Sequence, residues 1–240
     1  MREPDGRHGT ANELAVELAR LRAVAPLDNP LLELAQNGLV TPSHLRNLVL
    51  IEERYHGAEL VAYGTLLSRF PHSPASDFII AVARVVQDAR TRLATVAESL
   101  DTEPDAEPDA ERRACSPTLS GIRRDITAHG FCSYVSWLAL NGSQAAMGLA
   151  LYSDPDGIYY GGSRALVNGL RERGYELPDP FVEYYTGTPS KQQNDEALAV
   201  AQAGLDNGDD PVAALDAGRL CDQYMALLWK AAAGSYDDTP

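Results

Sequence analysis

Apolar residues recur every three or four positions along almost the whole chain, and strict alternation of apolar and polar residues is nearly absent. This spacing is typical of amphipathic helices that bury one face, whereas half-buried strands repeat every second residue. We therefore predict an all-α fold. Its helices should cover residues 11–24, 30–38, 42–70, 74–99, 117–152, 161–173, 178–185, 190–205 and 211–233.

A short dipeptide signal marks many of the predicted helix starts. A Ser, Thr, Asp or Asn is followed directly by proline, which suits the first helical position because the N–H that it lacks would have no partner there. The polar side chain before it can cap the free amides of the first turn. The signal occurs at Asn29-Pro30, Thr41-Pro42, Ser73-Pro74, Ser116-Pro117, Thr188-Pro189 and Asp210-Pro211.

Composition divides the chain into one region that should fold, one segment that should be a mobile loop, and two tails that should be disordered. The stretch "DTEPDAEPDAERRACSP" is acidic and proline-bearing, so it offers little apolar surface to offset the entropy of ordering, and we predict a mobile loop over residues 101–116. Residues 1–10 and 234–240 are predicted to be disordered tails. Residues 11–233 should form a single helical domain, since a chain of this length can build one core.

The charge balance and the absence of targeting signals limit the partners. Twenty basic residues stand against 34 acidic ones, a formal net charge of -14, which disfavours nucleic acids and anionic membrane surfaces. No apolar run approaches the roughly 20 residues of a membrane span. The N-terminus lacks the apolar core of a signal peptide, and the three cysteines are widely spaced, so we expect a cytoplasmic protein.

The stretch "LVLIEERYHGAELVAYG", residues 48–64, carries the first candidate site. At about 100° per residue, Glu52, His56, Glu59 and Tyr63 share one helical face, whereas Glu53 points elsewhere. Such a face could transfer protons or hold a single metal ion. The alternative is an ordinary solvated face on which the acids form exposed ion pairs.

Two further patterns have a functional and a structural interpretation. A tyrosine group, Tyr152, Tyr159, Tyr160, Tyr184 and Tyr185, would suit a cavity for a polar or aromatic metabolite, but core tyrosines with satisfied hydroxyls fit equally well. Separately, Asp125, His129 and Cys132 fall on one stripe, an order that could activate a thiolate. Most cysteines, however, act as small core residues.

The order of several motifs resembles the thiaminase II and pyrroloquinoline quinone synthase C group over roughly residues 28–233. The motifs are "LIEERYHGAEL", "SYVSWLAL", "SQAAMGLALYSD", "YYGGSRALVNGLRERG" and "DQYMALLWKAA". The resemblance implies a heme-oxygenase-like multi-helix bundle with a central pocket. We also expect assembly into homodimers or homotetramers.

The resemblance also assigns positions for the pocket residues. The pocket acid of the group would be Glu53, with Glu52 as the neighbouring choice, and the residue one turn on would be His56. The tyrosine of the central helix would be Tyr134, and the tyrosine after the turn would be Tyr159 or Tyr160. Two positions depart from the group, because its nucleophilic cysteine aligns with Gly148 and its last-helix glutamate aligns with Met225.

These observations predict an enzyme that binds a small metabolite, in specialised metabolism, and performs acid–base chemistry without a cofactor or metal. Cyclisation, elimination, C–N cleavage and cofactorless oxidation are the expected reaction classes. The expected catalytic groups are Glu53, His56 and Tyr134, and the expected substrate-binding groups are Glu52, Glu59, Tyr63, Tyr159, Tyr160 and Tyr184. One alternative is an iron-dependent oxygenase with Glu52, His56 and Glu59 as metal ligands, and another is a non-catalytic ligand-binding or regulatory protein.

Overall fold

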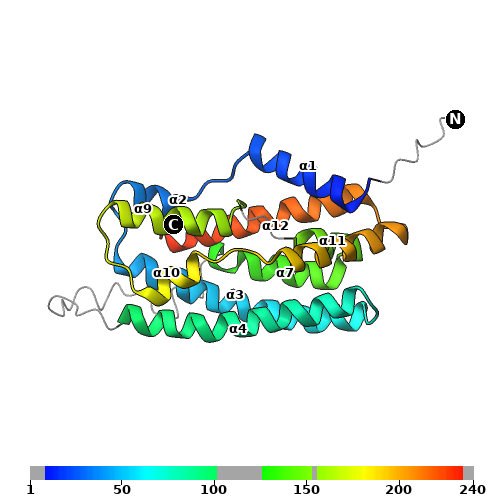
Figure 1. Ribbon diagram of the computed structural model, residues 1–240, viewed down its shortest axis with the longest axis horizontal. Coiled ribbons are helices and arrows are strands. Elements are labelled where there is room, and N and C mark those ends of the chain that lie inside the picture. Colours follow the sequence, from blue (N-terminus) through cyan, green and yellow to red (C-terminus); the bar gives the residue numbers. More distant parts are fainter. Residues whose placement is uncertain (1–8, 102–125, 153–155, 235–240) are drawn as a thin grey trace.

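The computed structural model describes residues 9–101, 126–152 and 156–234, and the regular elements in these ranges are all helices (Figure 1). The predicted all-α class is therefore confirmed. The elements are α1 (Ala11–Val24), α2 (Pro30–Gln36), α3 (Pro42–Arg69), α4 (Ala75–Asp101), the 3-10 turn η1 (Thr127–His129), α7 (Gly130–Asn141), α8 (Gln144–Ala150), α9 (Tyr160–Glu172), α10 (Asp179–Tyr185), α11 (Lys191–Asp206) and α12 (Pro211–Ala232).

The helix starts follow the capping signals in the sequence. α2, α3 and α12 begin at Pro30, Pro42 and Pro211, each directly after its polar residue. At the start of α11 the signal was misassigned, because Ser190 and not Thr188 is the cap and its hydroxyl accepts from the amide of Gln193. Capping side chains satisfy amides that have no partner inside the helix, so local sequence is enough to position these ends.

One predicted helix, 117–152, is wrong in its extent. Residues 117–125 lie outside the described residues, and the remainder is divided into η1, α7 and α8. α7 ends at Asn141, and Ser143 then caps a new helix by accepting from the amide of Ala146. Gly142 is buried, and a Cβ there would lie 2.7 Å from the carbonyl oxygen of Leu138, so this close packing is open only to glycine.

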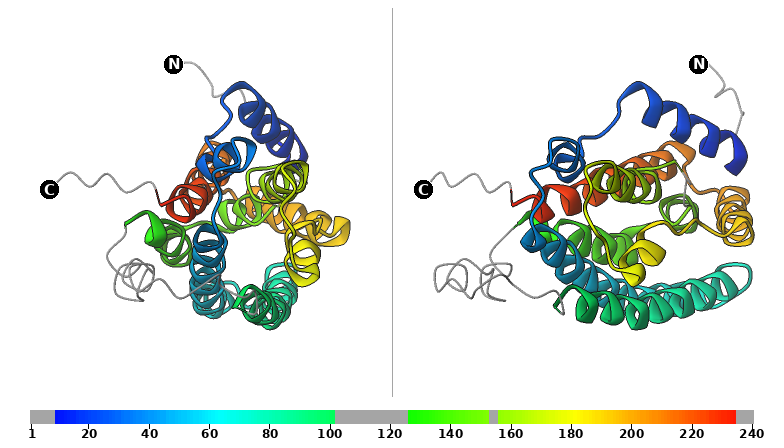
Figure 2. Two further views of the ribbon diagram at one scale, coloured as in Figure 1. Left: turned by 90° about the vertical axis from the view of Figure 1, so that its left-hand side faces the viewer. Right: turned by 60° about the vertical axis from the view of Figure 1, so that its left-hand side comes forward.

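The helices are arranged around a shared interior (Figures 1 and 2). α3 and α4 form a long antiparallel pair, and α3 also packs against α7 and α12. α8 packs against α11 and α12, and α10 packs against α4 and α9. α1 lies on the outside of the bundle, on the side away from α4, and contacts α12, α11 and α8. The two long helices thus form one wall, and the shorter helices face it.

The main hydrophobic core runs through α2, α3, α4, α7 and α9 to α12 as one continuous cluster. Trp229 lies in it with no exposed surface, and its indole N–H donates to the carbonyl oxygen of Ile158. Burying a large apolar side chain contributes roughly 1.5–3 kcal/mol, so such residues hold α12 against the rest of the bundle. A smaller cluster joins α1, α8, α11 and α12.

The predicted tails and acidic loop fall largely on residues 1–8, 102–125 and 235–240, which lie outside the described residues. Asp101, assigned by the sequence to the mobile segment, is the last residue of α4. Among the described helices, none combines the length and the apolar character of a membrane span.

Candidate functional site

The bundle contains a cavity of about 370 Å³ between α3, α4, α10 and α12. Its apolar wall includes Phe78, Val82 and Phe131, and its polar wall is formed by one face of α3 and a group of tyrosines. Arg92 and Thr188 line the cavity and are exposed, so they mark its mouth. A space of this size, apolar with a few convergent polar groups, suits a small organic ligand.

Glu52 is a buried carboxylate that accepts hydrogen bonds from three tyrosines. Its exposed fraction is 2%. Tyr159 and Tyr184 donate to Oε1, the latter over 2.9 Å, and Tyr185 donates to Oε2 over 2.7 Å. Such bonds offset the cost of removing a carboxylate from water. This face of α3 is therefore interior, and its interpretation as an ordinary solvated face is wrong.

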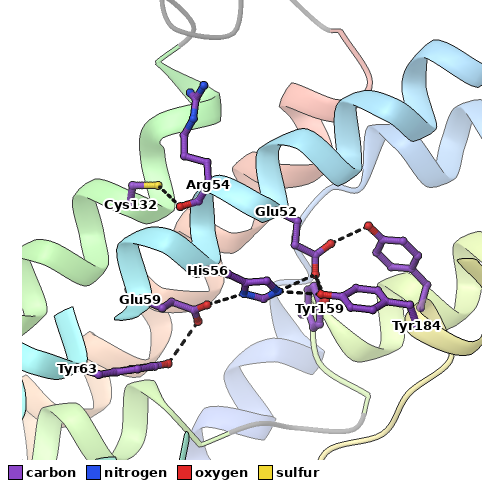
Figure 3. A network of polar contacts seen from close by, with 9 residues as sticks. Glu52, Arg54, His56, Glu59, Tyr63, Cys132, Tyr159 and Tyr184 are labelled. Atoms are coloured by element: carbon purple, nitrogen blue, oxygen red, sulfur yellow. Dashed lines mark hydrogen bonds and ion pairs between the residues drawn. The ribbon is translucent and has the colours of Figure 1, made fainter. Parts of the chain in front are cut away.

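His56 connects this group to a second carboxylate (Figure 3). Its Nδ1 lies 2.8 Å from Oε2 of Glu59, and its Nε2 lies 2.8 Å from the hydroxyl of Tyr184 and 3.8 Å from Oε1 of Glu52. Burial by itself lowers the pKa of His56, but the hydrogen bond with Glu59 and the charges of Glu59 and Glu52 outweigh it. The pKa of His56 is therefore raised, and the imidazole takes up a proton more readily than a free histidine.

Hydrogen-bond counting defines two states of this group that differ by one proton. When the Tyr184 hydroxyl donates to Glu52, Nε2 of His56 must donate to the Tyr184 oxygen, and Nδ1–H faces Glu59, so the imidazole is charged. When the Tyr184 hydroxyl instead donates to Nε2, the imidazole is neutral. Loss of the proton from Nε2 of His56, with rotation of the Tyr184 hydroxyl, converts the first state into the second. The group can thus accept or release a proton without moving its backbone.

Glu59 is the more accessible of the two carboxylates. Its side chain is 14% exposed, against 2% for Glu52. Among the described residues, its Oε1 has only the Tyr63 hydroxyl as a donor, at 3.4 Å, which is a long hydrogen bond. A ligand in the cavity can therefore hydrogen-bond to Glu59 without displacing a strong partner.

The phenols around Glu52 and the cavity remain protonated. Burial raises the pKa of Tyr159, Tyr184 and Tyr185, and the charge of Glu52 raises it further. Tyr160 packs edge-on against Tyr159, with ring centroids 5.1 Å apart, and its hydroxyl has no hydrogen-bond partner within the part of the chain that the structure describes. Burial and the charges of Glu59 and Glu52 raise the pKa of Tyr160 as well. Its hydroxyl is free to donate to a ligand.

An ion pair between distant segments completes the wall. Arg22, from α1, donates through Nε and Nη2 to the two carboxylate oxygens of Asp222 in α12, each over 2.8 Å. Both side chains line the cavity. Because the guanidinium and the carboxylate satisfy each other, this pair adds little net charge to the site.

Two of the three expected catalytic residues are not in the cavity. Glu53 is exposed and does not line it, because one helical step turns its side chain away from that of Glu52. Tyr134 is buried elsewhere, between α7 and α12, where its hydroxyl donates to the carbonyl oxygen of Ala217 and its ring stacks on Tyr224. The expected positions of Glu53 and Tyr134 were therefore wrong. The six expected substrate-binding residues, and His56, do line the cavity.

The Asp–His–Cys stripe is not organised as a nucleophilic group. Asp125 lies outside the described residues, and Nε2 of His129 lies 3.1 Å from Nη1 of Arg54. The thiol of Cys132 lies 3.9 Å from the carbonyl oxygen of Arg54 (Figure 3), and burial raises the pKa of Cys132 to about 11. A thiolate is disfavoured at this position.

The two positions at which the chain departs from the thiaminase II pattern have different surroundings. Gly148 faces α11, and a Cβ there would lie 2.6 Å from the amide nitrogen of Ala201, so no side chain at this position could reach the cavity. Met225 does line the cavity, where it adds an apolar thioether in place of an acid.

Glu52, His56 and Glu59 do not form a metal-binding group. The imidazole separates the two carboxylates, and both of its nitrogens are engaged in hydrogen bonds. Among the described residues, no group of three or more His, Cys, Asp and Glu side chains is placed to hold a metal ion.

Sequence reasoning did not predict the contacts of three residues that the structure brings to the site. Tyr185 belonged to the tyrosine group, but its hydrogen bond to Glu52 joins positions 133 residues apart. No local sequence pattern predicts a contact of that range. Arg92 was missed because a charged residue on an amphipathic helix is usually solvent-facing. Arg22 was missed because its partner, Asp222, lies 200 residues away.

Comparison with protein-family models, curated proteins and solved structures gives no match to this chain. The resemblance to the thiaminase II group therefore rests on the sequence motifs alone. The geometry of the cavity is the better guide to function, because one fold can carry many activities.

Proposed function

We propose that the chain is an enzyme that binds a small organic metabolite in the central cavity and moves protons on it by metal-free acid–base catalysis. The observation that carries this proposal is His56, which bridges the accessible carboxylate Glu59 and the buried pair of Tyr184 and Glu52. A buried chain of titratable groups with a raised histidine pKa, set in a cavity, is typical of catalytic sites.

Each group has a distinct role in the proposed mechanism. Glu59 removes a proton from the ligand, because it is the carboxylate with a weakly held oxygen. His56 takes up or returns a proton, and the Tyr184 hydroxyl rotates to match the charge of the imidazole. Tyr160 donates its free hydroxyl to the oxygen on which negative charge develops. Glu52 holds the tyrosines and the imidazole in position, so it is a positioning residue and not the base.

Such a site serves reactions whose difficult step is proton transfer. Cyclisation, elimination, C–N cleavage and cofactorless oxidation all belong to this class. A well-placed general base contributes roughly 10²–10⁴-fold to the rate. We also propose that the bundle belongs to the heme-oxygenase-like type seen in the thiaminase II group. The order of the helices, and the use of the long helix α3 as a cavity wall, support this assignment.

The test is turnover of a fractionated metabolite extract by the purified chain, followed by mass spectrometry. Glu59→Gln and His56→Gln should each lower the rate of any conversion by roughly 10²-fold or more. Glu53→Gln is the matched control, because it removes a carboxylate from the same helix but outside the cavity, and its rate should stay within about twofold of the wild type, since no substrate contact is lost.

Three results would contradict the proposal. Equal rates in Glu59→Gln and Glu53→Gln would remove Glu59 from the mechanism. Tight binding of a metabolite without any conversion would indicate a ligand-binding protein. Activity that is lost on chelation and restored by iron would indicate a metal-dependent oxygenase.

A further inference from the structure

At the mouth of the cavity lies Arg92, a guanidinium that has no carboxylate partner among the described residues. Arg92 of α4 lines the cavity, and its Cζ lies 5.6 Å from the centroid of the Tyr184 ring. Its charge also acts on Tyr160, where it opposes the effects of burial and of the carboxylates on the pKa of that phenol. Arg92 therefore lies close to the residues that would contact a ligand, although its own side chain is exposed.

The other charged groups of the wall are all engaged. Arg22 is paired with Asp222, Glu59 is paired with His56, and Glu52 accepts three phenol hydroxyls. Within the described ranges, Arg92 has neither an ion pair nor a hydrogen bond, and its contact is the Tyr184 ring. As far as the chain is described, the cavity thus has an acceptor-rich inner end and, in Arg92, an unpaired cation at its mouth.

We propose that Arg92 binds an anionic group of the ligand, a carboxylate or a phosphate, while the reactive part of the ligand reaches Glu59 and His56. This inference rests on the proposed function of the same cavity and adds the chemical class and the orientation of its ligand. A guanidinium recognises both anions through two parallel hydrogen bonds. The pairing is stronger at a partly closed mouth than in bulk water.

The distribution of charge fixes the orientation of the bound ligand. Glu52 and Glu59 repel an anion from the inner end, so the anionic group stays at the mouth and the apolar body lies against Phe78, Val82 and Phe131. The chain as a whole, with a formal net charge of -14, also repels anions. Binding of an anion therefore requires a local cation, and Arg92 supplies it.

The experiment uses small probes that share a phenyl ring and differ in their polar group. Phenylacetate, phenyl phosphate and the neutral phenylacetamide are titrated into the wild-type chain by calorimetry, with ligand-observed NMR for weak binding. The two anions should bind about tenfold more tightly than the amide, which is the ratio expected for one charge-assisted hydrogen-bonded pair. The comparison of phenylacetate with phenyl phosphate decides between the two kinds of anion.

Arg92→Gln should remove this preference and weaken binding of the anions by about tenfold, with little change for phenylacetamide. Arg84→Gln is the matched control, because Arg84 is exposed on the same helix and does not line the cavity. It should retain the wild-type preference. Added salt should weaken the binding of the two anions and leave the affinity for phenylacetamide unchanged.

Equal affinities for anions and amide, or equal effects of the two arginine variants, would overturn the inference and leave the proton-transfer proposal intact. Absence of anion binding up to about 10 mM, a concentration that fills even a millimolar site, would overturn it too. Conversely, a charge preference that depends on Arg92, together with unchanged turnover in Glu59→Gln, would reject the proposed function and retain the anion site.

Discussion

Glu52 and Glu53 are neighbours in the sequence, yet one is almost fully buried and the other faces solvent. Consecutive helical residues point about 100° apart, so only one of them can face the interior. The angle between the two side chains was predictable from the sequence. Which of the two faces inward depends on where α4, α10 and α12 pack against α3, and that is not a local property.

His56 leads to a prediction at the scale of one residue. Its pKa is raised in the folded chain, so its stabilising contribution is complete below its unfolded pKa of about 6.5 and is lost as the pH rises through the folded value. The difference in free energy of unfolding between the wild type and His56→Gln should therefore be largest near pH 6 and should shrink towards pH 8. Urea unfolding at a series of pH values measures it.

The source of this pH dependence can be checked in a second background. Glu59 supplies the hydrogen bond and the largest charge effect that raise the pKa of His56. In a Glu59→Gln chain, the substitution His56→Gln should lose most of its pH dependence. The prediction fails if the effect of His56→Gln on the free energy of unfolding grows with pH, or if its pH dependence is the same in the Glu59→Gln background. Either result would show that these contacts do not control the proton on His56.

At the scale of elements, α8 and α11 pack with their backbones in close contact. A Cβ at Gly148 would meet the amide nitrogen of Ala201 at 2.6 Å and the carbonyl oxygen of Ala197 at 2.7 Å. At Gly204, a Cβ would meet the amide nitrogen of Ala145 at 2.4 Å. The glycines therefore determine how closely these two helices approach each other.

The packing predicts opposite effects for two Gly→Ala substitutions. Gly148→Ala should lower the free energy of unfolding by roughly 1–3 kcal/mol or more, because the helices must separate. Gly64→Ala, on α3, places its Cβ in open space and should raise that free energy by about 0.5–1 kcal/mol through helix propensity. Chemical denaturation compares them, and a stabilised Gly148→Ala chain would contradict the close packing of α8 and α11.

At the scale of the whole molecule, α1 is attached to the bundle by polar contacts as well as apolar ones. Arg22 holds Asp222, and Nη2 of Arg219 donates to the carbonyl oxygen of Ala25 at the end of α1. At the other end of the helix, the amide of Ala11 donates to the side chain of Gln202. These contacts fix α1 at both ends, and one of them forms part of the cavity wall.

The Arg22–Asp222 pair predicts a large effect from a single change. Arg22→Met leaves Asp222 buried, with Nη1 of Arg219 as the remaining cation at 3.7 Å, and should lower the free energy of unfolding by about 3 kcal/mol. Lys191→Gln breaks an exposed ion pair with Asp195 and should lower the free energy of unfolding by less than about 0.5 kcal/mol. Urea unfolding gives both values.

Hydrogen exchange shows where the effect of Arg22→Met is located. Amides of α1 should exchange faster in this variant than in the wild type, because α1 loses one of its contacts with α12. If Arg22→Met and Lys191→Gln lowered the free energy of unfolding equally, or if amide exchange in α1 did not change, the Arg22–Asp222 pair would not be what holds α1 against the bundle.

The sequence alone determined the properties that depend on near neighbours. Helical periodicity predicted the helical class, and the capping residues predicted the starts of α2, α3 and α12 to the residue. The same periodicity placed Glu52, His56, Glu59 and Tyr63 on one face of α3. These features follow from side chains three or four positions apart, so a local pattern is sufficient to find them.

Tertiary structure alone decided which of these features meet. It selected Glu52 over Glu53 and turned Tyr134 towards α12. It also brought Tyr185 to Glu52 and Arg22 to Asp222, across 133 and 200 residues. Contacts of this range depend on how whole helices pack together, and the apolar spacing that predicts each helix leaves their mutual orientation open.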